Sequence, residues 1–315
     1  MPSPRAVIGC LAATAAVSVK AADNCDCYTI DGDSSVRYKS YGFWDFRSLS
    51  QYAGVPALID NFDDNQNADF TSDYFNQSSE FQEFWAPQKW SNENKILRTN
   101  SFNNLYIAPI EEGGSDTMLT LRTARGSNFQ STSAFQSKDF IDHASMRMYA
   151  RTHGASGACT SMFTYLGGDS IADVQESDIE VLTKESKDII NYTNQPAHMG
   201  NGTLVHGAGN KMKFPSGDTW TQWHTHRMDW TPGLVSWFLD GRELHSQSFQ
   251  APVDPSQIIF NAWSDGGNWT GLMEPDGQAF QDIQWIEIAY DLAEEGSCGN
   301  VCSVDEGAVG KPVAV

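Results

Sequence analysis

Segments in which apolar and polar side chains alternate residue by residue recur along most of this chain. Residues 116–122 and 145–151 both show this period of two, and in the second segment Met146, Met148 and Ala150 fall on one face. Because successive side chains of a strand point to opposite sides of its sheet, the alternation predicts β-strands that are buried on one side.

The joins between these segments indicate how the strands are connected. Asp240 and Gly241 separate strand patterns at residues 234–239 and 242–244, and Asp-Gly tolerates the positive φ angles of a two-residue hairpin turn. Helical periodicity is scarce, with about one turn expected at residues 45–49. Many short strands with joins rich in Gly, Asn and Asp, and no internal repeat, predict an all-β fold of the sandwich type.

Length and charge limit the classes of function. A chain of 315 residues can form one large all-β domain. The formal net charge of −20 disfavours binding to nucleic acid or to anionic membranes, because both need basic patches. A neutral polysaccharide is compatible with such a surface.

The N-terminal sequence has the features of a secretory signal peptide. Arg5 precedes an apolar run at residues 6–19, which is too short to span a bilayer, and small residues follow at Val19 and Ala21. We expect residues 1–22 to be removed, although Lys20 leaves the exact position of cleavage open. No later segment has the length of a transmembrane helix.

The cysteines agree with export into an oxidising compartment. Cys25 and Cys27 lie near one end of the chain and Cys298 and Cys302 near the other, so two disulfides joining the ends are expected. Their pairing stays open, except that Cys25 and Cys27 are too close to pair with each other. Cys159 is then a buried free thiol, and the absence of C-x₂-C spacing disfavours a metal site.

Four sequons add to the prediction of a secreted glycoprotein that is extracellular or located in the cell wall. Asn76, Asn191, Asn201 and Asn268 each begin an Asn-x-Ser/Thr acceptor sequence.

The strongest chemical signal is a group of three carboxylates at residues 174–182. If this segment is a strand, Glu176, Asp178 and Glu180 point to the same face, where they repel one another. Glycoside hydrolysis needs such crowding, since one carboxylate attacks the anomeric carbon while another stays protonated to release the leaving oxygen. An exposed acidic face is the competing interpretation, and a calcium loop is disfavoured because the D-x-[DN]-x-[DN]-G pattern is absent.

This Glu-x-Asp-x-Glu strand resembles the active-site motif of glycoside hydrolase family 16, in the variant without a bulge residue. Residues 161–165, 223–233, 237–241 and 260–263 resemble neighbouring strands of that family, and the likeness extends over about residues 60–292. Within that family the chain resembles fungal endo-β-1,3(4)-glucanases or laminarinases. The resemblance implies a jelly-roll β-sandwich of two curved antiparallel sheets, of the concanavalin A-like lectin and glucanase type.

The resemblance also implies residue roles. Glu176 would be the nucleophile, Asp178 its helper and Glu180 the acid/base of a retaining endo-hydrolase acting on β-1,3- or mixed β-1,3/1,4-glucan. The residues expected to contact the substrate are Phe163, Tyr165, Asn261, Trp263 and Trp269. No cofactor and no metal are expected.

The sequence departs from the bacterial lichenases of this family. They carry Glu and Arg where this chain aligns Ala134 and Gln136, and Trp where it has Val174, so a lichenase-like preference is not implied. Two alternatives stay open: a cell-wall transglycosylase with the same carboxylates, and a lectin-like glycan-binding protein, which would have no reason to keep all three.

The expected organisation follows from these points. Residues 1–22 are a signal peptide, residues 23–295 a catalytic jelly-roll domain that includes an N-terminal extension, and residues 296–315 a C-terminal tail with Cys298 and Cys302 that is disordered beyond Cys302. We expect a monomer whose partner is a β-glucan polysaccharide or oligosaccharide, without nucleic acid or membrane.

Overall fold

The chain is built almost entirely of β-strands, as the alternating pattern predicts. The computed structural model describes residues 24–31, 35–77, 79–93, 95–112, 115–215, 217–294 and 296–315. The predicted signal peptide, residues 1–22, lies outside the described residues. Helical structure among them is limited to α1 and short 3₁₀ turns: α1 (Phe81–Phe84), η1 (Ser50–Tyr52), η2 (Phe62–Asn67), η3 (Asp73–Phe75), η4 (Phe102–Asn104) and η5 (Ile171–Asp173).

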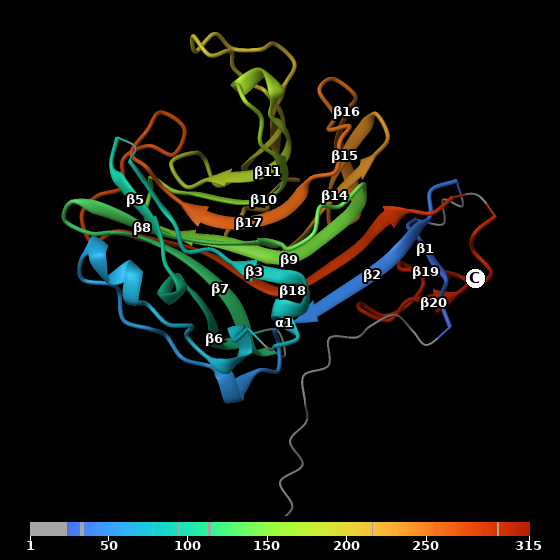
Figure 1. Cartoon of the computed structure of the whole chain (residues 1–315), viewed down its shortest axis with the longest axis horizontal. Helices are drawn as coiled ribbons and strands as arrows, with labels where there is room; N and C mark the ends of the chain where they lie inside the picture. Colours follow the sequence, from blue (N-terminus) through green and yellow to red (C-terminus); the bar gives the residue numbers. More distant parts are fainter. Residues whose placement is uncertain are drawn as a thin grey trace, which may run out of the picture.

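Two curved sheets, here called sheet 1 and sheet 2, lie one over the other and are continuous along one side through β8, which pairs with β7 (Figure 1). Sheet 1 has the order β3 (Trp85–Pro87), β8 (Phe129–Ser137), β17 (Gln257–Trp263), β10 (Cys159–Leu166), β11 (Gln175–Leu182), β12 (Ile189–Gln195) and β13 (Gly209–Lys213). The hairpin of β4 (Ser91–Glu93) and β5 (Leu97–Asn100) joins it, with β5 parallel to β8.

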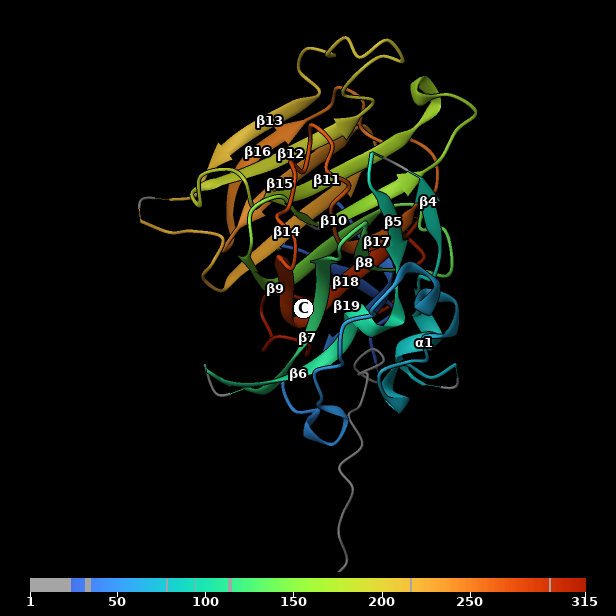
Figure 2. The same ribbon diagram turned by 90° about the vertical axis from the view of Figure 1, so that its left-hand side faces the viewer.

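Sheet 2 is antiparallel throughout. Its order is β6 (Leu105–Glu112), β7 (Ser115–Arg125), β18 (Gln278–Leu292), β9 (Ala144–Gly154), β14 (His224–Thr231), β15 (Leu234–Leu239) and β16 (Arg242–Gln247), and β2 (Tyr38–Asp45) pairs with the second half of β18. In Figure 2 the axes of β12 and β13 in sheet 1 and of β15 and β16 in sheet 2 are roughly aligned, while neighbouring strands alternate in direction. The all-β jelly-roll prediction is confirmed.

The core lies between the facing sides of the two sheets. From sheet 1, Phe135 and Phe260 stack with ring centroids 4.9 Å apart, and both contact Trp85. From sheet 2, Met146 and Met148 are buried, as their shared face predicts. Each such side chain contributes roughly 1.5–3 kcal/mol when removed from water, so this layer fixes which face of every strand points inward.

Local predictions had mixed outcomes. The β15–β16 hairpin has positive φ at both Asp240 (49°) and Gly241 (78°), which confirms the two-residue turn. The helical turn expected near residues 45–49 begins later, as η1 (Ser50–Tyr52) with Leu49 as its N-cap. The Thr117 hydroxyl on β7 donates a hydrogen bond to the Phe46 carbonyl oxygen and accepts one from the Leu49 backbone N–H. These two backbone groups are therefore not available for hydrogen bonds within a helical turn at residues 45–49.

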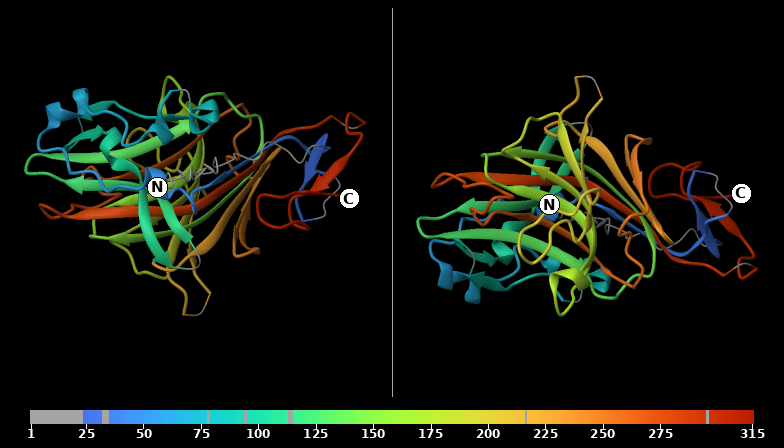
Figure 3. Two further views of the ribbon diagram at one scale, coloured as in Figure 1. Left: turned by 90° about the horizontal axis from the view of Figure 1, so that it is seen from below. Right: turned by 90° about the horizontal axis from the view of Figure 1, so that it is seen from above.

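Segments within residues 24–31 and 296–315 form a small terminal module beside sheet 2, where the C-terminus lies (Figure 3). It consists of β1 (Cys27–Thr29), which runs parallel to β19 (Val301–Ser303), and β20 (Val313–Ala314), which pairs with β19. The prediction that the tail is disordered beyond Cys302 is therefore wrong. Val304 is buried against the N-terminal strands, which supplies the apolar contact that the tail's composition did not suggest.

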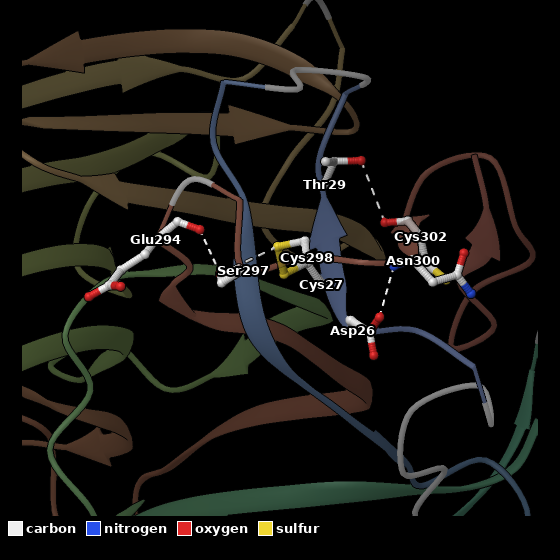
Figure 4. Close-up of a disulfide and its surroundings, with 8 residues drawn as sticks. All are labelled: Asp26, Cys27, Thr29, Glu294, Ser297, Cys298, Asn300 and Cys302. Carbon is white, nitrogen blue, oxygen red and sulfur yellow. Dashed lines mark hydrogen bonds between the residues drawn. A yellow bond between two sulfur atoms is a disulfide. The ribbon is translucent and has the colours of Figure 1, made fainter.

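Disulfides and hydrogen bonds hold this module together. Cys25 pairs with Cys302 and Cys27 with Cys298, which confirms two bridges between the chain ends and leaves Cys159 as a buried free thiol. Figure 4 shows the Cys27–Cys298 bridge beside Asp26, whose carboxylate accepts a hydrogen bond from the backbone N–H of Asn300 at 2.8 Å.

Ion pairs attach the terminal module to the outer side of sheet 2. Arg147 Nη2 lies 2.7 Å from Asp305 Oδ1, and Arg227 Nη2 lies 2.5 Å from Asp31 Oδ2. Both arginine side chains are largely buried, so these pairs are less screened than surface pairs. The module therefore packs on the side of sheet 2 that faces away from sheet 1.

One predicted glycosylation position does not suit the folded chain. Asn191 lies on β12, is 2% exposed and donates to Glu185 Oε2 at 3.0 Å, so a glycan has no room there. Asn76, Asn201 and Asn268 are exposed.

We predict a non-additive effect of the two disulfides on stability. Each bridge closes a loop of more than 270 residues (sequence separations 277 and 271), and the two loops are nested, so the second bridge adds little restriction once the first is formed. Replacing Cys27 and Cys298 by Ser should lower the free energy of unfolding by about 1 kcal/mol, and replacing all four cysteines by roughly 3–5 kcal/mol. Guanidinium unfolding measures both values. Equal and additive losses from the two bridges would contradict this.

Candidate active site

The three carboxylates of β11 share one face of sheet 1, and the opposite face of the same strand is core. Ile179 and Val181 are buried between the sheets, which directs Glu176, Asp178 and Glu180 to the other side. All three line a cleft of about 300 Å³. Asp178 is 2% exposed and Glu180 8% exposed, so this is not the solvated acidic face that the sequence left as an alternative.

Burial makes these carboxyl groups hold their protons more tightly than usual. Loss of hydration raises the pKa of Glu176 to about 7, against a lowering contribution from a hydrogen bond with Asp178. Loss of hydration, followed by the charges of Glu176 and Glu180, raises the pKa of Asp178 well above its usual value. The hydrogen bond between the two side chains lowers the pKa of Glu176 and raises that of Asp178, which is the direction expected when Asp178 is the donor and Glu176 the acceptor.

Asp178 is itself oriented by a neighbouring strand. Gln195, at the end of β12, donates from Nε2 to Asp178 Oδ2 at 3.3 Å. With one oxygen accepting from Gln195, the carboxyl group of Asp178 can direct its proton towards Glu176. Gln195 was not identified from the sequence, because its proximity depends on the β11–β12 register that aligns it with Glu176.

Glu180 accepts two hydrogen bonds on the same oxygen. The Trp269 indole donates from Nε1 to Glu180 Oε1 at 3.0 Å, and the Cys159 thiol donates from Sγ to Oε1 at 3.2 Å. Burial raises the pKa of Glu180, and these two donors partly lower it. Trp269, predicted to contact the substrate, is 41% exposed and directs its polar edge at this carboxylate.

The other predicted substrate contacts lie in the same cleft. Phe163 and Tyr165 are opposite Asp178 and Glu176 on the adjacent strand β10, and Asn261 and Trp263 follow on β17. The Ser161 hydroxyl donates to Asn261 Oδ1 at 2.5 Å, which fixes the orientation of that amide. Ala134 and Gln136 of β8, where the sequence departs from the lichenases, also line the cleft.

Several residues that line the cleft were not expected from the sequence: Gln88, Trp90, Arg98, Asn100, Ser161 and Ile259. Ser161 and Ile259 could have been found by extending the period of two from Phe163 and Asn261. Arg98 and Asn100 reach the cleft because β5 runs beside β8, and Gln88 because it follows β3, which also pairs with β8. No local sequence pattern indicates either pairing.

Arg98 occupies an unusual position among them. Its guanidinium lies 5.1 Å from the Trp90 ring centre and 5.0 Å from that of Trp263. Burial lowers its pKa, but contacts with two indole faces favour the cation. Arg98 thereby holds both aromatic side chains in the wall of the cleft.

The described residues contain neither a metal cluster nor a membrane-spanning helix. No group of three or more His, Cys, Asp or Glu side chains there could hold a metal ion. In the same part of the chain, no helix has the length and apolar character that crossing a membrane requires.

The chain is similar to known proteins in both sequence and fold. The family model described as "Glycosyl hydrolases family 16" matches residues 66–286. A β-glucanase from Bacillus amyloliquefaciens is 29% identical over 136 residues, which cover 42% of this chain and only 52% of that protein. A β-glucanase from Paenibacillus polymyxa is 24% identical over 213 residues, which cover 65% of this chain and 86% of that protein.

A solved structure has the same fold. The X-ray structure of an endo-β-1,3-glucanase from Pyrococcus furiosus aligns with a TM-score of 0.55 at 17% identity, covering 85% of this chain and 99% of the other.

We predict that burial of Glu176 makes the fold less stable as pH rises. A carboxyl whose pKa is raised in the folded state stabilises the fold fully below its unfolded pKa, and that contribution is lost as pH rises through the folded value of about 7. The free energy of unfolding should therefore fall by on the order of 2 kcal/mol more between pH 4.5 and 7.5 in the wild type than in Glu176→Gln. Urea unfolding at several pH values measures this. The control is Glu243→Gln, at an exposed position of β16. It removes one carboxyl group and should leave the pH dependence of the free energy of unfolding as in the wild type.

Proposed function

The chain belongs to glycosyl hydrolases family 16, and from this premise we propose that it is a retaining, endo-acting glycoside hydrolase that cleaves β-1,3- or mixed β-1,3/1,4-glucan. The observation that supports this most directly is the arrangement of Glu176, Asp178 and Glu180 on one strand face inside an open cleft. The names of the relatives, β-glucanases and an endo-β-1,3-glucanase, support the same substrate class.

Glu176 is proposed as the nucleophile. Asp178 donates a hydrogen bond to the Glu176 carboxylate, which stabilises the negative charge that must attack the anomeric carbon. When the covalent glycosyl-enzyme forms, that charge disappears and the repulsion on its neighbours decreases. Asp178 is therefore a helper that balances charge next to the reacting atom.

Glu180 is proposed as the acid/base. Its raised pKa keeps a proton available for the leaving oxygen, and it takes a proton from water in the second step. Along a strand, Glu176 and Glu180 have Cα atoms roughly 13 Å apart, and side chains leaning together on a curved sheet can reach the ~5–5.5 Å separation of retaining enzymes.

The walls of the cleft suit a neutral glucan. Trp90, Trp263, Phe163 and Tyr165 offer ring faces for sugar rings, and Asn261 offers an amide for hydroxyl groups. The net charge of −20 and the three catalytic carboxylates disfavour an anionic polysaccharide. Ala134 and Gln136 stand in the cleft wall where the lichenases carry a charged pair, so a lichenase-like preference is not part of this proposal.

Secretion to the extracellular space or the cell wall is also proposed. Two disulfides support it, because such bridges persist in oxidising compartments. Asn76, Asn201 and Asn268 are the acceptor positions with room for a glycan. We further propose that the protein acts as a monomer, since the cleft is assembled from a single chain.

We predict that Glu176→Gln and Glu180→Gln each lower kcat on the preferred glucan by roughly a thousandfold or more while keeping the fold, since each removes one half of the two-step chemistry. Laminarin, mixed-linkage glucan, galactan and chitin oligomers are offered in parallel, with products sized by mass spectrometry. Glu243→Gln is the matched control and should keep wild-type rates. A wild-type rate in either active-site variant would refute the assigned roles.

We also predict that the first product has the β configuration at its new reducing end. Attack by Glu176 inverts the anomeric carbon once, and attack by water on the covalent intermediate inverts it again. Proton NMR of the early reaction mixture, recorded before mutarotation, distinguishes the two anomers. An initial α product would mean that the two glutamates do not act as nucleophile and acid/base.

A further inference from the structure

Cys159 occupies a position that its role as a buried thiol does not explain. It is the first residue of β10, is completely buried, and takes no part in either disulfide. Buried free cysteines usually behave as small apolar side chains. By the period of two, however, Cys159 shares the cleft face of β10 with Ser161 and Phe163, and its sulfur lies 3.2 Å from Glu180 Oε1.

The direction of this hydrogen bond follows from chemistry. Burial, and then the neighbouring Glu180 carboxylate, raise the pKa of the Cys159 thiol well above its usual value, so the sulfur keeps its hydrogen. Glu180 Oε1 also accepts the Trp269 indole N–H at 3.0 Å, and an indole N–H can only donate. Glu180 Oε1 thus receives two donors at once.

Two donors on one oxygen decide where the proton of this carboxyl group sits. A hydrogen on Oε1 would meet the N–H of Trp269 and the S–H of Cys159 head-on. Among the described residues, no protein group forms a hydrogen bond with Oε2. This oxygen is also not fully buried, so it is accessible from the cleft. The proton of the neutral form therefore belongs on Oε2.

We propose that Cys159 is a positioning residue of the acid/base: together with Trp269 it reserves Oε1 of Glu180 as an acceptor, keeps the transferable proton on Oε2, and weakens the hold of Glu180 on that proton. This inference rests on the proposed glycosidase function of the site. Cys159 acts through Glu180 and does not touch the substrate.

A thiol suits this position because it is a weak donor. Glu180 must release a proton in one step and recover it in the next, so its carboxylate form should be stabilised only moderately. A methyl group at position 159 would give no stabilisation, and a hydroxyl would give at least as much as the thiol because O–H is the stronger donor. The identity of the side chain at position 159 therefore sets the protonation range of Glu180.

Other charged groups around Glu180 stay the same when Cys159 is changed. They are Glu176 and Asp178 on its own strand, Glu185 just beyond the end of β11, which is paired with Lys211 of β13, and Arg98 across the cleft on β5. A comparison of variants at position 159 therefore isolates the effect of the thiol.

The test uses the full-length protein and the variants Cys159→Ala and Cys159→Ser. The measurement is the pH dependence of kcat/KM on the preferred glucan, whose basic limb reports loss of the acid/base proton. Cys159→Ala should move this limb up by about half a pH unit, because a hydrogen bond to the carboxylate is lost. Cys159→Ser should leave it at or below the wild-type position.

Met162→Leu is the matched control, because it alters packing of the same strand from the core side without touching Glu180. It should keep the wild-type basic limb even if its melting temperature falls. A basic limb unchanged in Cys159→Ala, or raised equally in Cys159→Ser, would overturn the proposal. If Cys159→Ala does not fold, Cys159→Val, which also lacks a donor, takes its place: a raised basic limb supports the proposal and an unchanged one overturns it.

A second readout separates this inference from the proposed function. The carboxyl stretch of Glu180, isolated as the infrared difference between each protein and its Glu180→Gln counterpart, gives the titration of that group without any substrate. If the wild type cleaves no glucan, the proposed function fails. The shift of this titration between Cys159→Ala and wild type still decides whether the thiol tunes Glu180.

Discussion

The burial of three carboxylates on one face of β11 is the constraint on which the rest of the cleft depends. Removing a carboxylate from water costs free energy unless it is hydrogen-bonded, paired with a cation or neutralised by a proton. In the described part of the chain none of the three forms an ion pair. Their burial is instead balanced by a proton on Asp178 and by neutral donors, and this balance has a chemical consequence. A bound lysine or arginine would fix both glutamates as anions, whereas neutral donors leave one proton free to move.

The parts of the site that the sequence could predict are those governed by the geometry of a single strand. The period of two places the carboxylates of β11 together, pairs Phe163 with Tyr165, and pairs Asn261 with Trp263, and each of these pairs does line the cleft. The β15–β16 turn and the presence of two bridges between the chain ends follow equally from local composition or from counting. In all these cases the physical cause lies within a few residues.

The parts that the sequence could not predict depend on which strands become neighbours. Arg98 and Trp263 are far apart in the chain, and their contact exists because β5 and β17 both pair with β8. The bonds from Cys159 and Trp269 to Glu180 likewise need the register of β10 on β11 and the path of a loop. Residues 45–49 failed to form a helical turn for a similar reason, because Thr117 from a distant strand takes up their backbone groups. Alternation identifies the face of a strand, but it does not identify the partner across it.

The disulfides of the terminal module also make most of the polypeptide covalently cyclic. With Cys25 joined to Cys302 and Cys27 to Cys298, the polypeptide between the bridges is covalently a ring, and both sheets lie within it. Exopeptidases digest a chain from a free end, and there is no free end between the two bridges from which a strand could be unpaired. Degradation must begin with an internal cut in a surface loop, and a single cut of this kind leaves the fragments connected. Resistance of this chain to proteases would then depend on its surface loops rather than on its ends.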